Sequence, residues 1–390
     1  MKDATGAIRL QPTKSEFREH SGPIFMTSSF QYSSAEEAEA YFSGKIEGDI
    51  YSRFSNPNTT ELIDKMCHLE QLPSGVATAS GMAAIFATLS AHLKSGDLVV
   101  ASGSLFGNTL YILQNILPNW GINVILVDIK DKERWEKAIG KKPKMVLIET
   151  PSNPGLQLID LAWLSGLSHQ HNSIFAVDNC FATPIIQKPA LFGADMVLHS
   201  ATKFIDGQGR VLGGIVLGKE EFITPVFDFL RRTGASLSPF NAWILSKSLE
   251  TLEVRMERHS KNALSLAREL ESHSGITSVS YPFLESHPDL TLAKKQMKWG
   301  GGVLCCNLKG DKSHAFNFIN SLSLLSITAN LGDTRTIVTH PATTTHSKLS
   351  PEERVKSGIT DTTLRFSVGL ESIDDIINDI TDALEKSNIE

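Results

Sequence analysis

Short apolar runs alternate with helix-like patterns between about residue 75 and residue 220. This alternation is typical of a parallel sheet whose strands are joined by crossover helices. The runs that we predict to be strands are rich in aliphatic side chains: Leu98–Ala101, Val124–Val127, Met145–Ile148, Ile174–Val177, Met196–His199 and Gly214–Leu217. We therefore expect an α/β fold with a mostly parallel central sheet.

A helix is predicted to follow Ser80, because apolar residues recur at helical spacing after Gly81-Met82: Ile85, Phe86, Leu89 and Leu93. We expect Gly96 to end this helix. Its first turn would present backbone N–H groups without partners, which favour an anion. Alternatively, Ser80-Gly81 is an ordinary cap and turn.

The pattern changes after Pro239, where a long segment carries apolar residues on one helical face: Leu245, Leu249, Leu252, Met256, Leu266 and Leu270. Further on, Gly302–Asn307 and Thr362–Ser367 are predicted strands. The last helix is expected to begin at Ser372, with a capping box between Ser372 and Asp375. Its buried face would hold Ile373, Ile376, Ile377, Ile380 and Leu384.

These patterns divide the chain into three parts. Residues 1–55 are irregular and aromatic, and we expect them to form an arm that packs on a neighbouring subunit. Residues 56–245 would form the large domain, and residues 246–390 a smaller α+β domain.

Composition and charge narrow the possible classes of protein. The 390 residues are 41% hydrophobic, and 37 basic residues are scattered among 43 acidic ones, for a net charge of −6. This balance argues against a surface for nucleic acid or for an anionic membrane. No run is apolar enough for a signal peptide or a membrane span, so we expect a cytoplasmic protein. Four cysteines without CxxC spacing are expected to be reduced.

Polar side chains follow several of the predicted strands: Ser102, Glu149, Asp178, Ser200 and Lys203. Because ligands of open α/β sheets bind outside the carboxyl ends of the strands, we expect these side chains to converge. A lysine at such a place can bond to the aldehyde of pyridoxal phosphate as a Schiff base, while a carboxylate pairs with the pyridinium nitrogen. Gly81 would let the backbone approach the phosphate closely, and Ser200 and Thr202 would add hydroxyl groups.

Three other interpretations have weaker support. Asp206–Gly214 resembles a dinucleotide-binding GxGxxG motif, but Leu212 replaces the third glycine and the segment precedes a strand. His340 and His346 do not have the spacing of a zinc site, and we expect no metal there. Glu149 and Asp178 could be the paired carboxylates of a hydrolase, although nothing in the sequence places a substrate between them.

Six motifs in order resemble the pyridoxal-phosphate enzymes of cysteine and methionine metabolism, a family that includes cystathionine γ-synthases, methionine γ-lyases and homoserine sulfhydrylases. The motifs are Tyr51–Pro57, Ser80–Ala84, Glu149–Pro154, Val177–Asn179, Ser200–Lys203 and Leu364–Glu371. Within the family, the tracts His199–Gly214 and Asn330–His346 look most like the O-succinylhomoserine sulfhydrylases. The resemblance implies the type I fold of aspartate aminotransferase, with a seven-stranded sheet and a smaller C-terminal domain.

The resemblance also implies roles for individual residues. Lys203 would be the Schiff-base lysine, and Asp178 the partner of the ring nitrogen. Cofactor contacts would come from Gly81, Met82, Ser200 and Thr202 at the phosphate, and from Tyr51 and Arg53 at the phosphate of a neighbouring subunit. The expected assembly is a homotetramer, a dimer of dimers. Arg365 would bind the α-carboxylate of the substrate, assisted by Asn153.

Three positions depart from the family pattern. Phe106 stands where many relatives have a tyrosine that stacks on the cofactor, so stacking is kept but the phenol is lost. Asn108 replaces the cysteine of methionine γ-lyases, and Asn330 replaces a serine near the substrate carboxylate. The expected reaction is the formation of homocysteine from O-succinylhomoserine and sulfide. Alternatives are a cystathionine γ-synthase, an O-acetylhomoserine sulfhydrylase, a γ-lyase, or a cofactor-free structural or regulatory relative.

Overall fold

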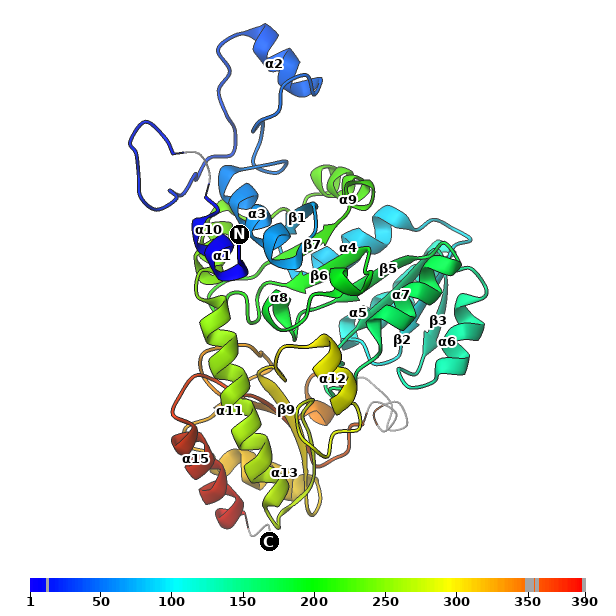
Figure 1. The fold of residues 1–390 in the computed structure, drawn as a ribbon, viewed down its shortest axis with the longest axis vertical. Coiled ribbons are helices and arrows are strands. Elements are labelled where there is room, and N and C mark those ends of the chain that lie inside the picture. Colours follow the sequence, from blue (N-terminus) through cyan, green and yellow to red (C-terminus); the bar gives the residue numbers. More distant parts are fainter. Residues whose placement is uncertain (12–13, 348–353, 355–357, 388–390) are drawn as a thin grey trace.

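The computed structural model describes residues 1–11, 14–347, 354 and 358–387. Its main feature is a seven-stranded sheet with the order β1-β7-β6-β5-β4-β2-β3 (Figure 1). Strand β7 is antiparallel to both of its neighbours, whereas β6, β5, β4, β2 and β3 pair in parallel. The strands are β1 Ser74–Thr78, β2 Leu98–Ser102, β3 Asn123–Val127, β4 Met145–Glu149, β5 Ile174–Asp178, β6 Met196–Ser200 and β7 Gly214–Gly218. The predicted α/β fold with a mostly parallel sheet is confirmed.

All six predicted strands are present, and each is one residue longer than predicted. Three of the added residues are Glu149, Asp178 and Ser200, which are therefore the last residues of their strands. The prediction missed β1, whose residues Ser74–Thr78 are mostly small. Pairing with β7 along its whole length places this weakly apolar segment at the sheet edge.

Helices cover both faces of this sheet because successive strand residues point to opposite sides. One core combines strand residues such as Val177 with helices α3 (Pro57–Glu70), α6 (Lys132–Ile139), α7 (Leu161–Gln170) and α10 (Pro239–Leu249). The other core combines strand residues such as Leu198 with helices α4 (Gly81–His92) and α9 (Glu220–Thr233). Shorter helical segments complete this part: α5 Gly107–Tyr111, η1 Ile112–Ile116, η2 Leu117–Trp120, α8 Thr183–Ile186 and η3 Pro189–Phe192.

Two helix predictions need correction. Helix α4 begins at Gly81 as expected but ends at His92, because the backbone of Leu93 is already extended; Gly96 lies in the following loop. The long segment after Pro239 forms two helices, α10 and α11 (Leu252–Ser272), separated at Glu250 and Thr251. Its predicted apolar face is buried along both helices. The first core described above contains Leu245, Leu249, Leu252 and Met256, and the core of the C-terminal region contains Leu266 and Leu270.

A second, five-stranded sheet lies in the C-terminal region, in the order β10-β11-β12-β9-β8. Its strands are β8 Ile276–Ser280, β9 Val303–Leu308, β10 Ser326–Ile327, β11 Ile337–Thr339 and β12 Thr363–Ser367. The described helical segments that follow α11 in the chain are α12 Leu290–Gln296, α13 Lys312–Ser321, η4 Pro341–Thr343 and α15 Ile373–Lys386. The predicted apolar face of α15 packs on this sheet. The predicted capping box is wrong, since Ser372 precedes α15 but its side chain makes no capping hydrogen bond.

The N-terminal residues extend away from the rest of the chain in Figure 1, where α2 (Ala35–Phe42) lies far from the sheet. Helix α1 (Asp3–Arg9) instead packs beside α3. The projecting part exposes large apolar side chains, with Phe17 84%, Met26 69% and Phe42 68% exposed. None of the helices in the described ranges is both long and apolar enough to span a membrane.

Candidate active site

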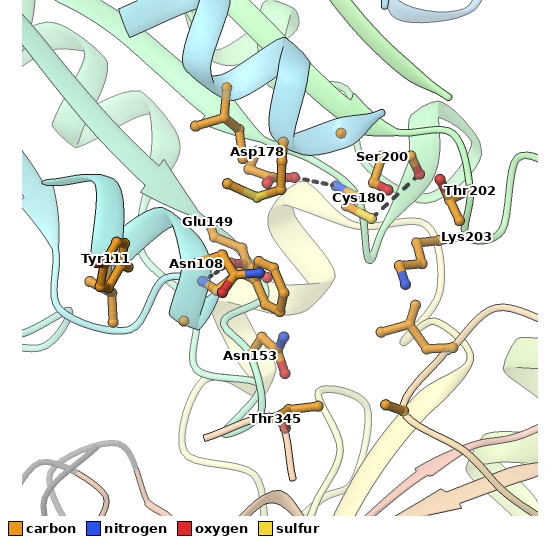
Figure 2. Close-up of a pocket in the computed structure, with 18 of the residues that line it drawn as sticks. Asn108, Tyr111, Glu149, Asn153, Asp178, Cys180, Ser200, Thr202, Lys203 and Thr345 are labelled. Atoms are coloured by element: carbon orange, nitrogen blue, oxygen red, sulfur yellow. Dashed lines mark hydrogen bonds between the residues drawn. The ribbon is translucent and has the colours of Figure 1, made fainter. Parts of the chain in front are cut away.

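A cavity of about 780 Å³ lies at the carboxyl ends of β4, β5 and β6, between the large sheet and the C-terminal sheet (Figure 2). Most of the predicted site residues line it: Gly81, Met82, Phe106, Asn153, Asp178, Ser200, Thr202, Lys203 and Arg365. Glu149 lines it as well, as expected for a residue at a strand end. Ser102 is an exception, because its hydroxyl group is buried and accepts a hydrogen bond from the amide of Ser104 instead.

Lys203 follows the end of β6 by three residues, and its amine points into the cavity. The Nζ atom donates to Oδ1 of Asn330 over 2.6 Å. Burial lowers the pKa of this amine, and the nearby Arg365 cation lowers the pKa further. An amine with a lowered pKa is more often neutral at physiological pH, which is the form that acts as a nucleophile or a base.

Two carboxyl groups lie side by side at the ends of β4 and β5, where Glu149 and Asp178 are paired in register. Burial raises the pKa of Asp178 to about 6, against a hydrogen bond of 3.0 Å from the amide of Cys180. Burial and the charge of Asp178 together raise the pKa of Glu149 well above its ordinary value. The Glu149 carboxylate accepts a hydrogen bond of 2.8 Å from the amide of Phe106, so it holds that loop in place.

The start of helix α4 meets the end of β6 very closely. A Cβ atom on Gly81 would lie 2.6 Å from Cβ and 2.8 Å from Oγ of Ser200, so only glycine fits there. Among the described residues, none accepts a hydrogen bond from the amides of Gly81 and Met82. Free amides at a helix N-terminus, with the Ser200 hydroxyl beside them, are suited to a phosphate group. Thr202 instead exchanges hydrogen bonds with the backbone of Gly213.

Arg365 lies in the middle of β12 and is 2% exposed. Its guanidinium donates to Oδ1 of Asn153 over 3.1 Å and to the carbonyl oxygen of Asn330 over 3.3 Å. Burial lowers its pKa, and its Nε atom is buried without a partner among the described residues. A buried cation with a spare donor, facing a cavity, is suited to a carboxylate.

Three of the predicted site residues, Tyr51, Arg53 and Asn330, do not line the main cavity. Tyr51 and Arg53 line a separate cavity of about 360 Å³ and do not reach the main one. Tyr51 is 40% exposed, and Arg53 donates a hydrogen bond to the carbonyl oxygen of Arg231. Asn330 lies just outside the lining, but its side chain accepts a hydrogen bond from Lys203 and its carbonyl oxygen accepts one from Arg365.

Sequence reasoning missed some of the residues in and near the cavity. Cys180 lines it, and burial raises the pKa of its thiol. His346 also lines it, and burial, together with the Arg365 cation, lowers the pKa of its imidazole to about 4. Cys180 follows Asp178 by two residues in the sequence, and this closeness could have indicated that it lies in the site. His346 comes from a distant loop that no local pattern links to the site. The described residues contain no cluster of metal-ligand side chains.

Comparisons with known proteins agree with this geometry. The profile of the family described as Cys/Met metabolism PLP-dependent enzyme matches residues 4–385. An O-succinylhomoserine sulfhydrylase from Pseudomonas aeruginosa is 44% identical over 97% of this chain and 94% of its own length. An L-methionine gamma-lyase from Fusobacterium nucleatum is 42% identical over 98% of both chains. An O-acetylhomoserine (thiol)-lyase structure from Campylobacter jejuni, which carries N'-pyridoxyl-lysine-5'-monophosphate, covers 99% of this chain and 100% of its own at 35% identity and a TM-score of 0.95. The chain therefore belongs to the family of pyridoxal-phosphate-dependent enzymes of cysteine and methionine metabolism.

Proposed function

We propose that this protein is an O-succinylhomoserine sulfhydrylase, which replaces the succinate of O-succinyl-L-homoserine by sulfide and forms L-homocysteine. The observation that carries this proposal is that one cavity is lined by both Lys203, whose amine has a lowered pKa, and the buried Arg365. The relative from Pseudomonas aeruginosa supports the choice of substrate. The atoms balance, because the Cγ–O bond breaks and releases succinate, the Cγ–S bond forms with sulfide, and the protons removed from Cα and Cβ are returned to the product.

The residues of the cavity fit pyridoxal phosphate. Lys203 would bond to its aldehyde carbon, and Phe106 would stack on the ring. Asp178 would face the ring nitrogen. Burial disfavours the ionised form of its carboxylate, and the positive charge of the protonated ring nitrogen would favour that form. The amides of Gly81 and Met82 and the Ser200 hydroxyl would hold the phosphate, and Thr202 would position the lysine loop. When bound, the cofactor supplies an electron sink that acidifies the protons at Cα and Cβ of the substrate.

Once the amino group of the substrate has replaced the Lys203 amine at the aldehyde carbon, the freed amine would move the protons of the reaction. This amine is partly desolvated and has a lowered pKa, so it can take the proton from Cα and then the proton from Cβ. Asn330 accepts from the same amine at 2.6 Å and would hold it toward the substrate. Arg365 would bind the α-carboxylate through its planar fork, and Asn153 would fix the orientation of that fork.

Phe106 bears on the choice between replacement and elimination. Its ring has no hydroxyl group, so any step that needs a phenol as proton donor or acceptor has none at this position. This places more proton transfer on Lys203 and disfavours a γ-lyase. A cystathionine γ-synthase is the second candidate, since it would use the same residues with cysteine as the nucleophile.

We also propose that the active enzyme is a homotetramer in the cytoplasm, with sites shared between subunits. The projecting arm exposes Phe17, Met26 and Phe42, which a second copy of the chain would cover. Tyr51 and Arg53 lie near the base of this arm, outside their own chain's cavity, and would reach the phosphate in a neighbouring subunit. All four cysteines are free thiols, which is usual in a reducing compartment.

Product analysis tests the reaction. The purified, cofactor-loaded protein is given O-succinylhomoserine with sulfide, with cysteine, or with neither. Homocysteine formed mainly with sulfide is the expected result. Cystathionine formed mainly with cysteine would replace the proposal by a synthase, and an oxoacid with ammonia and no nucleophile would replace it by a lyase. The same assay with O-acetylhomoserine identifies the ester, and a protein that stays colourless with pyridoxal phosphate would be a cofactor-free relative.

A further inference from the structure

Helix α11 carries several polar side chains that are almost completely buried, among them Arg255, which is 6% exposed, His259, 0%, and Asn262, 3%. These three are spaced four and then three residues apart, which places them above one another on a single helical face. Burying polar groups is costly unless they are hydrogen-bonded, so apolar residues would serve simple packing better. All three side chains donate to backbone carbonyl groups of segments next to the active site.

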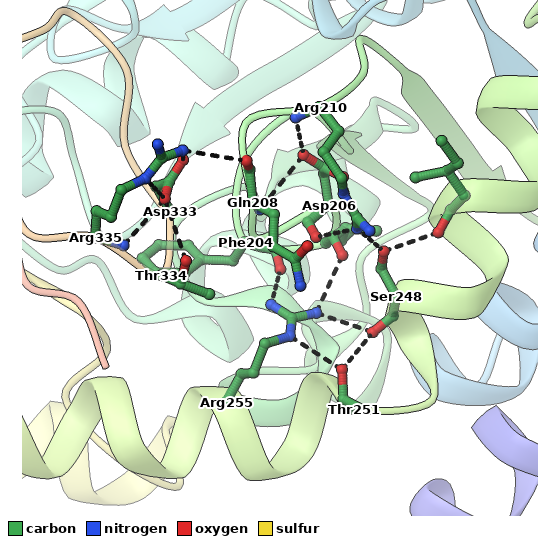
Figure 3. A network of polar contacts seen from close by, with 12 residues as sticks. Phe204, Asp206, Gln208, Arg210, Ser248, Thr251, Arg255, Asp333, Thr334 and Arg335 are labelled. Atoms are coloured by element: carbon green, nitrogen blue, oxygen red, sulfur yellow. Dashed lines mark hydrogen bonds and ion pairs between the residues drawn. The ribbon is translucent and has the colours of Figure 1, made fainter. Parts of the chain in front are cut away.

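Arg255 holds the segment that follows Lys203 (Figure 3). Its Nη1 atom donates to the carbonyl oxygen of Phe204 over 2.6 Å, and Nη2 donates to that of Ile205 over 3.1 Å. The same Nη2 donates to the carbonyl oxygen of Ser248 over 2.9 Å, at the end of α10. The approach is so close that a Cβ atom on Gly207 would lie 2.2 Å from Nη1. The two residues after Lys203 are therefore fixed directly to the start of α11.

Asn262 holds the segment that follows strand β12, which carries Arg365. Its Nδ2 atom donates to the carbonyl oxygens of Gly369 and Glu371, each over 3.0 Å. These two residues come shortly after the strand ends at Ser367. A shift of this segment would be passed along β12 to the guanidinium.

His259 lies between the other two and contacts both segments. Its Nδ1 atom lies 2.6 Å from the carbonyl oxygen of Val368, and because a carbonyl only accepts, Nδ1 carries the proton. Its ring meets the ring of Phe204 edge to face, with centroids 5.2 Å apart. Burial lowers the pKa of His259 to about 4, so the side chain is neutral at physiological pH.

We propose that Arg255, His259 and Asn262 are positioning residues that set the separation between the Lys203 amine and the Arg365 guanidinium. Arg255 fixes the lysine side, Asn262 fixes the arginine side, and His259 joins the two. The reacting carbon of the substrate would lie between these groups, where a misplacement of about 1 Å can cost on the order of 100-fold in rate. The inference rests on the roles proposed above for Lys203 and Arg365.

The test compares variants at the two ends of the row. Arg255→Ala should weaken the visible circular dichroism of the bound cofactor, which depends on how the protein holds the ring, and should lower kcat by about 10- to 100-fold. Asn262→Asp keeps the shape of the side chain but places an acceptor against two carbonyl groups. It should raise KM and the Kd for L-norvaline, an amino acid without a leaving group, by about tenfold, and it should leave the dichroism unchanged. Arg255→Lys, which keeps the charge but not the fork, should restore part of the dichroism.

Controls separate positioning from stability. Leu266→Ala removes buried apolar volume on the same helix, and Lys261→Ala changes an exposed side chain on it. The proposal is overturned if Arg255→Ala or Asn262→Asp has the same profile as Leu266→Ala, with thermal stability lowered but dichroism and L-norvaline binding unchanged. It is also overturned if the two end variants lose the same property. If Arg255→Ala does not fold, Arg255→Lys must itself show weaker dichroism than the unaltered protein, and full dichroism in that variant overturns the proposal. Dichroism and L-norvaline binding need no turnover, so these outcomes stay distinct from a failure of the proposed reaction.

Discussion

Replacing Arg365 by alanine tests the most specific contact that we assign to the substrate. The guanidinium already uses one side for Asn153 and Asn330, and its buried Nε has no partner among the described residues. The substrate α-carboxylate would supply the missing acceptor. The substitution removes this contact and also removes a cation whose burial has to be offset by an anion.

The expected size of the effect follows from the strength of a hydrogen bond to a charged group, about 1.5–3 kcal/mol. This range corresponds to a loss of roughly 10- to 160-fold in kcat/KM, at 1.36 kcal/mol for each factor of ten. KM should rise. The absorbance of the bound cofactor should remain, since Lys203 and Asp178 are unchanged.

The assay measures initial rates over a range of O-succinylhomoserine concentrations at a fixed excess of sulfide. Arg365→Lys keeps the charge without the planar fork, and we expect it to recover only part of the loss. Arg232→Ala, which removes an exposed arginine that pairs with Asp228, serves as the control and should leave both constants unchanged. An unchanged KM in Arg365→Ala would refute the reasoning and would place the carboxylate site elsewhere.

Three further predictions concern the cofactor side of the cavity. Lys203→Ala should abolish both turnover and the absorbance of the covalently bound cofactor, and wild-type turnover in this variant would end the proposal. Gly81→Ala should weaken cofactor binding by roughly 5- to 150-fold in an equilibrium titration, because overpacking against Ser200 costs about 1–3 kcal/mol; unchanged affinity would show that the close contact is unimportant. The pKa of Asp178 is about 6 in the folded cofactor-free protein, against an ordinary 3.8 in an unfolded chain, so the folded state binds the proton more tightly. This group therefore makes the protein less stable as the pH rises from about 4 to 6, by up to ~3 kcal/mol. Urea unfolding at several pH values should show that Asp178→Asn removes this part of the slope, and parallel curves for the two proteins would contradict the assignment.

Much of the seven-stranded sheet followed from local patterns in the sequence. Apolar runs such as Met145–Ile148 and Ile174–Val177 have the length and composition of buried strands, and parallel strands must bring their carboxyl ends to one edge. Glu149, Asp178 and Lys203 were therefore expected together, and they line one cavity. Strand β1 was missed, because pairing with β7 and not its own composition makes it a strand.

The contacts that complete the candidate site depend on residues far apart in the chain. Lys203 and Asn330 are 127 residues apart, and Arg365 and Asn153 are 212 residues apart. No periodicity links such positions. The family motifs indicated which residues matter, but the hydrogen bond between Asn330 and Lys203 is decided by how the two sheets pack.

The sequence by itself determined the class of fold, the family and the cluster of residues at the strand ends, because strand patterns and motifs are properties of neighbouring residues. Only the tertiary structure decided the rest: that Ser372 makes no capping bond, that Glu149 holds the amide of Phe106, and that α11 joins the segments behind Lys203 and Arg365. The physical reason is that each of these depends on the direction and distance between elements. Those quantities are fixed by packing across the whole chain and are not encoded in any local stretch of it.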